Sequence, residues 1–200
     1  MFTGIIRDIG QITSLNTSNG DLNLSIKTTL ELNKTNIGDS ICCGGVCLTV
    51  IKIKNDIFNV ELSKETLSVS AAKFWKKDTK INIEKSLLLG DQIGGHLVSG
   101  HVDSVTVLQS KKNIKGSVRL VFKSPKEIQA YIAKKGSISI DGVSLTINEV
   151  NKSSFNVNVI SHTFNNTTLG QLNEKDLVNI EIDTIARYAV NAAKYYIKEK

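Results

Sequence analysis

The sequence predicts an all-β protein of two tandem units, each a small antiparallel barrel or sandwich of about six strands, followed by one C-terminal helix. Three features predict this fold: an internal repeat, short alternating apolar segments between turn residues, and a helical periodicity confined to the last residues. The chain has 200 residues, of which 40% are hydrophobic, so it is long enough to bury two cores of ordinary domain size.

The repeat becomes visible when the chain is aligned with itself at an offset of 96 or 97 positions. DSICCGGVCLTV at 39–50 then matches GSISIDGVSLTI at 136–147, and FTGII at 2–6 matches VSGHV at 98–102. Two further matches follow in the same order: IFNVELSKETL at 57–67 with SFNVNVISHTF at 154–164, and INIE at 81–84 with VNIE at 178–181. Self-similarity over nearly the whole chain indicates a tandem duplication of one domain.

Within each unit, strands are expected where apolar and polar residues alternate, as they do around Leu22 and Leu24. This alternation is typical of half-buried strands, and turn residues separate such segments about every 8 to 12 residues. Each unit also carries one short helix, which we expect over 63–72 in the first unit and over 124–134 in the second. Pro125 then takes the first helical position, where a missing N–H costs nothing.

The domain boundary is expected in segment 87–96, which contains two adjacent glycines and no strand pattern. This divides the chain into domains at 1–90 and 97–185 and a C-terminal helix at 186–200. The last stretch, from residue 184 onward, has no counterpart in the repeat. Its apolar residues recur at spacings of three and four and form one stripe: Ile185, Tyr188, Ala189, Ala192, Tyr196 and Ile197. This stripe fits packing on its own domain and self-association equally well.

Charge and motif content exclude several classes of function. Lys and Arg number 25 against 19 Asp and Glu, but the basic residues are scattered and aromatic residues make up only 6% of the chain. That pattern is typical of a solvated surface and not of a base-stacking platform for nucleic acid. The sequence contains no Walker loop, no strand-to-helix GxGxxG and no GxSxG elbow, which disfavours phosphate cradling, dinucleotide binding and elbow-type hydrolysis.

The compartment is expected to be the cytoplasm. No apolar run of about 18 residues predicts a membrane span, and the start MFTGIIRDIG lacks the pattern of a signal peptide. The three cysteines, Cys42, Cys43 and Cys47, are odd in number and crowded, which indicates reduced thiols. Adjacent cysteines and only three histidines also fit a zinc site poorly.

One position of the repeat changes its chemistry. GVCLTV in the first unit corresponds to GVSLTI in the second, so that Ser144 takes the place of Cys47. Strand alternation puts Cys43 and Cys47 on one face and Cys42 on the other, unless the two intervening glycines bulge the strand. A position that accepts either Cys or Ser is typical of a hydrogen-bonding site beside a ligand, although a buried Ser satisfied by backbone gives the same pattern.

Two further matched segments carry polar side chains suited to a ligand site. GGHLVSGHVD at 94–103 holds two of the three histidines, which can give or take a proton near neutral pH, among glycines that let backbone approach a flat ligand. A loop histidine that is merely solvated is the alternative. KETL at 64–67 and SHTF at 161–164 each keep a threonine, Thr66 and Thr163, which caps a helix or binds a ligand.

Together, MFTGII at the start, GVCLTV and GVSLTI, GGHLVSGHVD at the junction and TTLG at 167–170 resemble riboflavin synthase of the alpha-chain type, over essentially the whole chain. The resemblance implies two tandem six-stranded antiparallel Greek-key barrels, a C-terminal helix that assembles a homotrimer, and no metal or redox cofactor. It also implies a transferase of riboflavin biosynthesis. Two molecules of 6,7-dimethyl-8-ribityllumazine would exchange a four-carbon unit, giving riboflavin and 5-amino-6-ribitylamino-2,4-pyrimidinedione. The resemblance also raises lumazine synthase as a protein partner.

The resemblance also implies which residues form the site. Those that would assist the chemistry are His101, Ser144, Cys47 and Asp183. An N-terminal pocket would use Gly4, Ile5, Ile6, Cys47, Leu48, Thr49, Glu61, Leu62, Ser63, Lys64, Glu65 and Thr66, with Phe2 closing over it. A C-terminal pocket would use Gly100, His101, Val102, Lys135, Ser144, Leu145, Thr146, Asn158, Val159, Ile160, Ser161, His162 and Thr163. The chain departs from the family at His162, where family members often have Glu.

Two other functions are alternatives to this one. A non-catalytic antenna-type protein of the same fold, which binds lumazine or flavin, keeps one pocket and loses polar residues in the other. Here Ser144, Thr146, His101 and Lys135 are all present, which favours an enzyme. A basic barrel that binds single-stranded nucleic acid would need clustered aromatic residues, which the sequence lacks.

Overall fold

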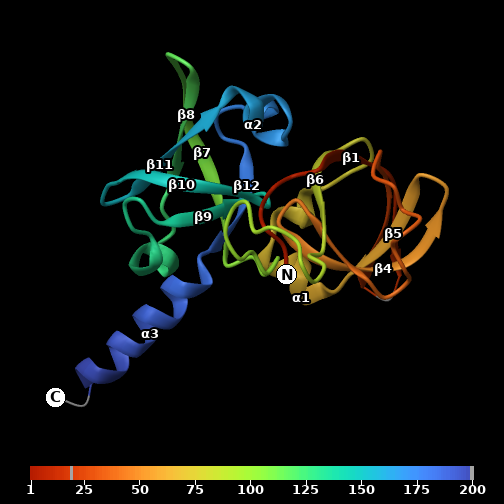
Figure 1. The fold of residues 1–200 in the computed structure, drawn as a ribbon, viewed down its shortest axis with the longest axis horizontal. Coiled ribbons are helices and arrows are strands. Elements are labelled where there is room, and N and C mark those ends of the chain that lie inside the picture. The colour runs from red at the N-terminus through yellow and green to blue at the C-terminus, as the bar shows by residue number, and fades with distance from the viewer. Residues whose placement is uncertain (19, 199–200) are drawn as a thin grey trace.

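Two closed barrels lie side by side in the computed structural model, which describes residues 1–18 and 20–198 (Figure 1). The strands of the first barrel are β1 (Asp8–Ser18), β2 (Asp21–Lys27), β3 (Ser40–Cys43), β4 (Val46–Lys54), β5 (Ile57–Leu62) and β6 (Lys80–Lys85). Those of the second are β7 (Ser104–Ile114), β8 (Ser117–Lys123), β9 (Ser137–Ile140), β10 (Val143–Val150), β11 (Ser154–Ile160) and β12 (Leu177–Ile182). Both barrels arise from one repeated unit.

Each barrel has the topology of a Greek key. The first runs in the order β1-β2-β5-β4-β3-β6, and β6 pairs back on β1 to close the sheet. Strands β3, β4 and β5 are hairpin neighbours, and β6 returns to lie beside β3. The second barrel repeats this arrangement with β7 to β12. The prediction of an all-β fold is thereby confirmed, and of the two architectures considered the barrel is correct, since closure removes every sheet edge.

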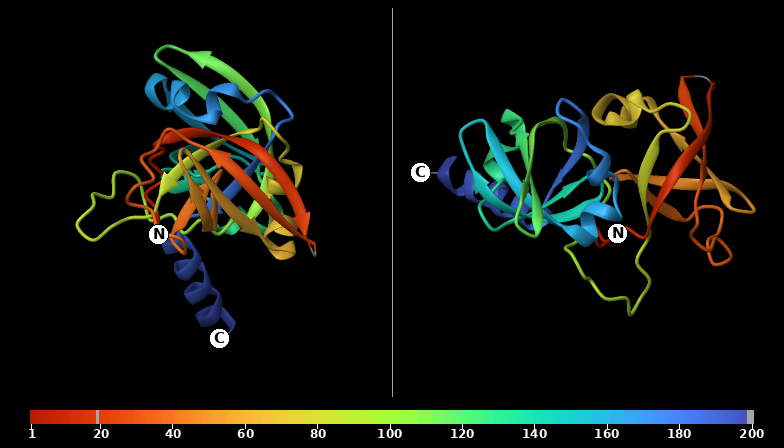
Figure 2. Two further views of the ribbon diagram at one scale, coloured as in Figure 1. Left: turned by 90° about the vertical axis from the view of Figure 1, so that its right-hand side faces the viewer. Right: turned by 90° about the horizontal axis from the view of Figure 1, so that it is seen from above.

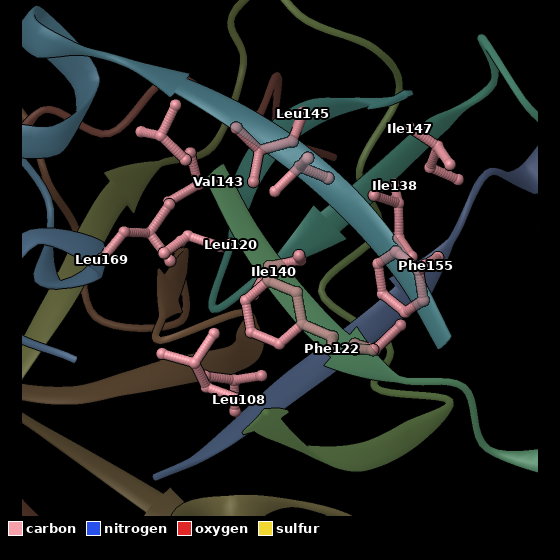
Figure 3. Close-up of a cluster of buried hydrophobic side chains, with 14 of the residues drawn as sticks. Leu108, Leu120, Phe122, Ile138, Ile140, Val143, Leu145, Ile147, Phe155 and Leu169 are labelled. Carbon is pink, nitrogen blue, oxygen red and sulfur yellow. The ribbon is translucent and has the colours of Figure 1, made fainter. Parts of the chain in front are cut away.

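The interior of each barrel is filled by alternate residues of its strands. On β5, for example, Phe58, Val60 and Leu62 face inward and are fully buried. In the second barrel Phe122 and Phe155 are direct cross-strand partners, and their rings stack at 5.7 Å between centroids (Figure 3). Aromatic pairs of this kind add to the stability that comes from burying apolar area.

The barrels are joined by two asparagines that occupy equivalent positions in the repeats. Asn179 on β12 accepts from the Ala71 N–H at 2.6 Å and donates to the Gly44 carbonyl at 2.7 Å. Asn82 on β6 of the first barrel makes the equivalent bonds to the second barrel: it donates to the Asp141 carbonyl at 2.9 Å and accepts from the Thr168 N–H at 2.8 Å. Each side chain is buried and satisfies backbone groups of the other barrel, as buried polar groups require.

The hairpin turns that follow β3 and β9 also meet between the barrels. A Cβ atom on Gly45 would lie 2.8 Å from the backbone nitrogen of Gly142, and one on Gly142 would lie 3.0 Å from that of Gly45. Both residues have positive φ angles of 84° and 82°. Glycine is therefore required twice over at each turn, by the backbone conformation and by the close approach.

The short helices differ in part from those expected. The segment expected over 63–72 divides into α1 (Lys64–Val69) and the 3₁₀ helix η1 (Ala71–Phe74), because Ser70 between them is extended. The helix expected over 124–134 is the shorter 3₁₀ helix η2 (Lys126–Tyr131), and Pro125 precedes it with an extended ψ of 136°. The sequence reading missed two further elements: α2 (Ser161–Asn165) and the 3₁₀ helix η3 (Thr168–Gln171).

The C-terminal helix α3 (Thr184–Lys198) projects away from the second barrel, and the connecting segment between the barrels also extends outward (Figure 2). The helix begins two residues earlier than the expected 186, and the expected last residues 199–200 lie outside the described part of the chain. Arg187 holds its first turn against the second barrel through an ion pair with Asp103 at 2.7 Å. The larger apolar side chains of α3, among them Ile185 and Tyr188, are exposed. None of the helices within residues 1–18 and 20–198 has both the length and the apolar character needed to cross a membrane.

We expect the variant Asn179→Ala to lower the free energy of unfolding by about 1 to 3 kcal/mol, because it leaves the Ala71 N–H and the Gly44 carbonyl without partners in a buried contact. Urea denaturation at neutral pH would measure the loss. The control is Asn33→Ala, which changes an exposed asparagine of the same kind. Equal denaturation midpoints for the two variants would contradict the role given to Asn179.

Candidate functional site

Cys47 and Ser144 occupy equivalent, outward-facing positions on β4 and β10. Their neighbours in each strand, such as Val46 and Val143, face the barrel interiors. Of the two arrangements considered for the cysteines, simple alternation is wrong and interruption at the two glycines is correct: Cys47 lies directly opposite Cys42 across the β3–β4 pair. The two glycines between the strands form a tight turn with positive φ angles, so the alternation restarts after the turn and Cys43 points into the core.

The first segment of each repeat crosses to the barrel of the other repeat. Phe2 and Val98 form an antiparallel bridge between these segments, with N–H···O distances of 2.7 and 3.0 Å. Beyond the bridge, the Ser144 N–H donates to the Gly4 carbonyl at 2.8 Å. Likewise, the Cys47 N–H donates to the Gly100 carbonyl at 2.8 Å. Each candidate site is therefore built from both repeats.

Glycine is required at both crossing points. A Cβ atom on Gly4 would lie 2.5 Å from Ser144 Cβ, and one on Gly100 would lie 2.5 Å from Cys47 Cβ. Both glycines also have positive φ angles, of 74° and 79°. Any larger residue would push the crossing segment away from the strand, so these glycines keep backbone and strand in contact.

This exchange corrects two expectations about the pockets. Segment 4–6 was expected beside Cys47 and segment 100–102 beside Ser144, whereas the structure places each with the other partner. Phe2 was expected to close over the N-terminal pocket, but it is fully buried in an apolar cluster between the barrels, together with Cys42 and Val98. It acts there as part of the bridge that holds the crossing segments.

A cavity of about 210 Å³ opens beside Cys47. Strand β4, the helix α1 and the crossing segment of the second repeat line this Cys47 pocket with Val46, Cys47, Glu65, Thr66, Val69, Ser70, Gly100, His101 and Val102. Ser63 caps α1 by accepting from the Thr66 N–H at 3.2 Å, which fixes the start of the helix at the pocket edge. Five other residues expected in one pocket or the other thus gather here around the thiol: Glu65, Thr66, Gly100, His101 and Val102.

Ser144 is paired with a buried histidine that sequence reasoning did not select. His96 Nδ1 lies 2.7 Å from Ser144 Oγ, and the side chain of His96 is 9% exposed. Burial lowers the pKa of His96 below its ordinary value of 6.5, while the charge of Asp183 opposes this shift. Its Nε2 finds no hydrogen-bond partner within the described residues. A neutral imidazole beside a hydroxyl is the arrangement that orients and activates a nucleophile or moves a proton.

The sequence predicts His101 as the histidine that assists the chemistry, but His101 is exposed and lines the Cys47 pocket. His96 lies in the same GGHLVSGHVD segment, and its N–H donates to the Thr3 carbonyl at 3.2 Å. The signal that could have identified it is the Gly94-Gly95 pair before it: a Cβ on Gly95 would lie 2.7 Å from Ser144 Cβ, so only glycine lets this segment cover the serine.

The remaining expected residues divide by the direction of their side chains. Four belong to the barrel cores, so only their backbone can face a ligand: Leu48, Leu62, Leu145 and Val159. Others are exposed on the outer surface: Thr49, Glu61, Ser63, Lys64, Lys135, Thr146, Ile160, Ser161 and His162. Ile5, Ile6 and Thr163 are half-buried, and Asp183 caps the first turn of α3 by accepting from the Ile185 N–H at 2.9 Å.

Asn158 has a cross-strand neighbour, Arg119, that the sequence reading also missed. It lies directly opposite Arg119 across the β8–β11 pair. Asn158 Oδ1 and Arg119 Nε are both buried, and within the described chain neither has a hydrogen-bond partner. Buried polar atoms of this kind are normally satisfied, so they are groups that a bound polar ligand could pair. As for metals, three His, Cys, Asp or Glu side chains nowhere gather into a group that could hold an ion, in the part of the chain that the structure describes.

Two closed barrels from a duplicated unit, with Cys47 and Ser144 at equivalent positions that each contact the other repeat, define a tandem-barrel protein. The model of the lumazine binding domain matches residues 3–86 and again residues 99–183. The chain is 42% identical over 200 residues to riboflavin synthase of Brucella abortus (strain 2308), which covers 98% of this chain and 99% of that protein. It is 39% identical over 189 residues to riboflavin synthase of Photobacterium phosphoreum, which covers 94% of this chain and 87% of that one. The chain belongs to the riboflavin synthase family of lumazine-binding-domain proteins.

The fold is also shared with a solved structure, that of LumP complexed with riboflavin. The TM-score is 0.83, at 23% sequence identity, over 91% of this chain and 99% of the other. This likeness concerns the fold of the paired barrels.

Protein stability should depend on pH through His96. Because burial lowers the pKa of His96 in the folded protein, the unfolded chain binds a proton at this residue more readily, so stability is lost as the pH falls through the ordinary histidine pKa of 6.5. We therefore expect the urea midpoint of the wild type to fall more than that of His96→Asn between about pH 7.5 and about pH 5.5. His162→Asn, which changes an exposed histidine, is the control, and its urea midpoint should fall with pH as much as that of the wild type. An equal fall of the urea midpoint in all three proteins would refute the role given to His96.

Proposed function

We propose that this protein catalyses the dismutation of two molecules of 6,7-dimethyl-8-ribityllumazine. One molecule transfers a four-carbon unit to the other, which gives riboflavin and 5-amino-6-ribitylamino-2,4-pyrimidinedione, the final step of riboflavin biosynthesis. The observation that carries the proposal is the pair of equivalent sites at Cys47 and Ser144, each completed by the other repeat. A reaction between two identical flat molecules needs two related surfaces, and holding both turns an encounter of two molecules into a step within one complex.

The two sites differ where two identical substrates must play different parts. At Ser144, the buried and neutral His96 can accept the proton of the hydroxyl, and the nearby carboxylate of Asp183 stabilises the charge that then forms on the ring. At Cys47, the thiol lies in a cavity with the exposed His101. The reaction requires removal of a methyl proton from one lumazine and addition of a nucleophile to the other. We assign the nucleophilic and proton-transfer chemistry to the Ser144 side, and substrate positioning to the Cys47 side.

The complete site is proposed to form between subunits of a homotrimer. The Cys47 pocket measures about 210 Å³, whereas small-molecule sites usually enclose about 300 to 1,000 Å³. The N-terminal barrel of one subunit would therefore face the C-terminal barrel of its neighbour. The exposed apolar side chains of α3, including Ile185, Tyr188 and Ile197, would pack together in the assembly. The units 1–90, 97–185 and 186–200 then serve as two substrate-binding domains and an oligomerisation helix.

The setting of the reaction belongs to the same proposal. The cytoplasm is the compartment proposed, since its reducing conditions keep thiols such as Cys47 free. Association with a lumazine synthase would deliver the substrate directly, and co-sedimentation of the two purified proteins would test it.

A non-catalytic lumazine-binding or flavin-binding protein of the same fold is the second candidate. It is favoured only by the likeness in fold to LumP. Incubation of the purified protein with 6,7-dimethyl-8-ribityllumazine separates the two, because riboflavin formation is visible by its fluorescence. Lumazine binding without any riboflavin would establish the second candidate and end the first.

We expect Ser144→Ala to lower turnover by about tenfold to a hundredfold, since it leaves the buried His96 Nδ1 without its partner in the reacting complex. Cys47→Ala should have a smaller effect, because the thiol lines the wall of its pocket. Steady-state rates of riboflavin formation would measure both variants, and their circular dichroism spectra would control for folding. A larger loss for Cys47→Ala would place the reactive chemistry in the other site.

Deletion of residues 184–200 should abolish activity while leaving folded monomer. The barrels keep their cores and their asparagine contacts, but the exposed apolar face that joins subunits is lost. Sedimentation velocity and the fluorescence assay would follow assembly and activity together. A truncated monomer with full activity would rule out a site shared between subunits.

A further inference from the structure

Two buried glutamates hold the crossing segments in place. Glu84 on β6 accepts from the Thr3 N–H at 2.8 Å through one carboxylate oxygen and from the Gly4 N–H at 2.9 Å through the other. Glu181, its equivalent on β12, accepts from the Ser99 N–H at 2.6 Å and the Gly100 N–H at 2.8 Å in the same manner. Both carboxylates therefore clamp two successive backbone donors of one crossing segment.

The environment of both glutamates is unfavourable to a carboxylate. Their side chains are 4% and 3% exposed. Burial raises the pKa of Glu84, although its bonds from Thr3 and Gly4 oppose the shift, and burial raises the pKa of Glu181 to about 7. A buried carboxylate is poor evidence for stability, because desolvation offsets much of what its hydrogen bonds contribute. A role in fixing geometry accounts better for two such groups at equivalent positions.

The clamped residues are the ones that contact the two candidate sites. The Gly4 carbonyl accepts from the Ser144 N–H, and the Thr3 carbonyl accepts from the N–H of His96, the partner of Ser144. In the other half, the Gly100 carbonyl accepts from the Cys47 N–H. A single residue, Gly4 or Gly100, thus contacts both the carboxylate and the site.

We propose that Glu84 and Glu181 are positioning residues that act crosswise: Glu84 of the first repeat sets the Ser144 site of the second, and Glu181 of the second sets the Cys47 pocket of the first. As positioning residues for catalysis they rest on the proposed function, whereas their crosswise action on the two sites does not. Alignment of the repeats would assign each glutamate to its own barrel. The contacts of Gly4 and Gly100 assign it to the opposite one.

Each site has one readout that does not depend on turnover. The rate at which iodoacetamide alkylates Cys47 reports its pocket, because Cys42 and Cys43 are buried and burial raises the pKa of each thiol. The pH titration of the His96 ring in NMR spectra reports the Ser144 site.

The test compares Glu84→Gln and Glu181→Gln, which keep the size of the side chain and replace one acceptor with a donor. We expect Glu181→Gln to change the alkylation rate of Cys47 by about fivefold, the factor expected for one lost hydrogen bond, and to leave the His96 titration unchanged. We expect Glu84→Gln to shift the His96 titration and to leave the alkylation rate unchanged. Glu31→Gln, which changes an exposed glutamate, should alter neither.

The crossed pattern decides the proposal. If each variant affects the site of its own barrel, or both affect both sites equally, the crosswise role is wrong. If Glu84→Gln fails to fold, Thr3→Val replaces it. This variant exchanges for a methyl group the hydroxyl that donates to Glu84 at 2.6 Å and accepts from the Ile5 N–H at 3.2 Å, and it should shift the His96 titration in the same direction. A wild type that forms no riboflavin would end the proposed function and leave both of these readouts valid. Where riboflavin is formed, both Gln variants should lower kcat more than they raise KM.

Discussion

The backbone hydrogen bonds from Ser144 to Gly4 and from Cys47 to Gly100 are the constraint on which the rest of the site depends. Each joins a strand of one barrel to the first segment of the other repeat. The Phe2–Val98 bridge, the turns that meet between the barrels and the buried carboxylates all keep these segments in register. Without the other repeat, the Cys47 pocket would lose the wall formed by Gly100, His101 and Val102, and Ser144 would lose its contact with Gly4.

Within this symmetric frame, the chemistry of the two sites is asymmetric. The frame uses glycine, asparagine and glutamate at the same positions in both halves, whereas the residue at its centre is a thiol in one half and a hydroxyl in the other. His96 is near Ser144 because the segment between the barrels folds back over it, and burial keeps the ring neutral where a solvated histidine would be partly charged. Equivalent backbone geometry thus surrounds two positions whose side chains and electrostatic environments differ.

The sequence predicts the fold well because strand alternation and turn chemistry are local, and because the repeat halves the problem. It predicts the site less well, because an alignment of repeats shows which residues are equivalent but not which ones touch. Gly4 was therefore placed beside Cys47, and Phe2 was taken for a lid when it is a buried bridge. The His96–Ser144 contact joins residues 48 positions apart, which no local pattern reveals. The faces of the cysteines depended on whether the two glycines interrupt the strand, and their tight turn does reset the alternation.

The two hairpin turns that meet between the barrels also limit how the copies of a duplicated segment can diverge. Gly45 faces Gly142, its own copy, so a change in either must fit the unchanged other at once, and both have remained glycine. Cys47 and Ser144 do not face each other: each contacts a glycine of the other repeat, Gly100 or Gly4, so one can change its side chain without the other. The meeting turns therefore constrain both copies of the segment together, whereas Cys47 and Ser144 each meet a different segment of the other repeat and differ in chemistry between the halves.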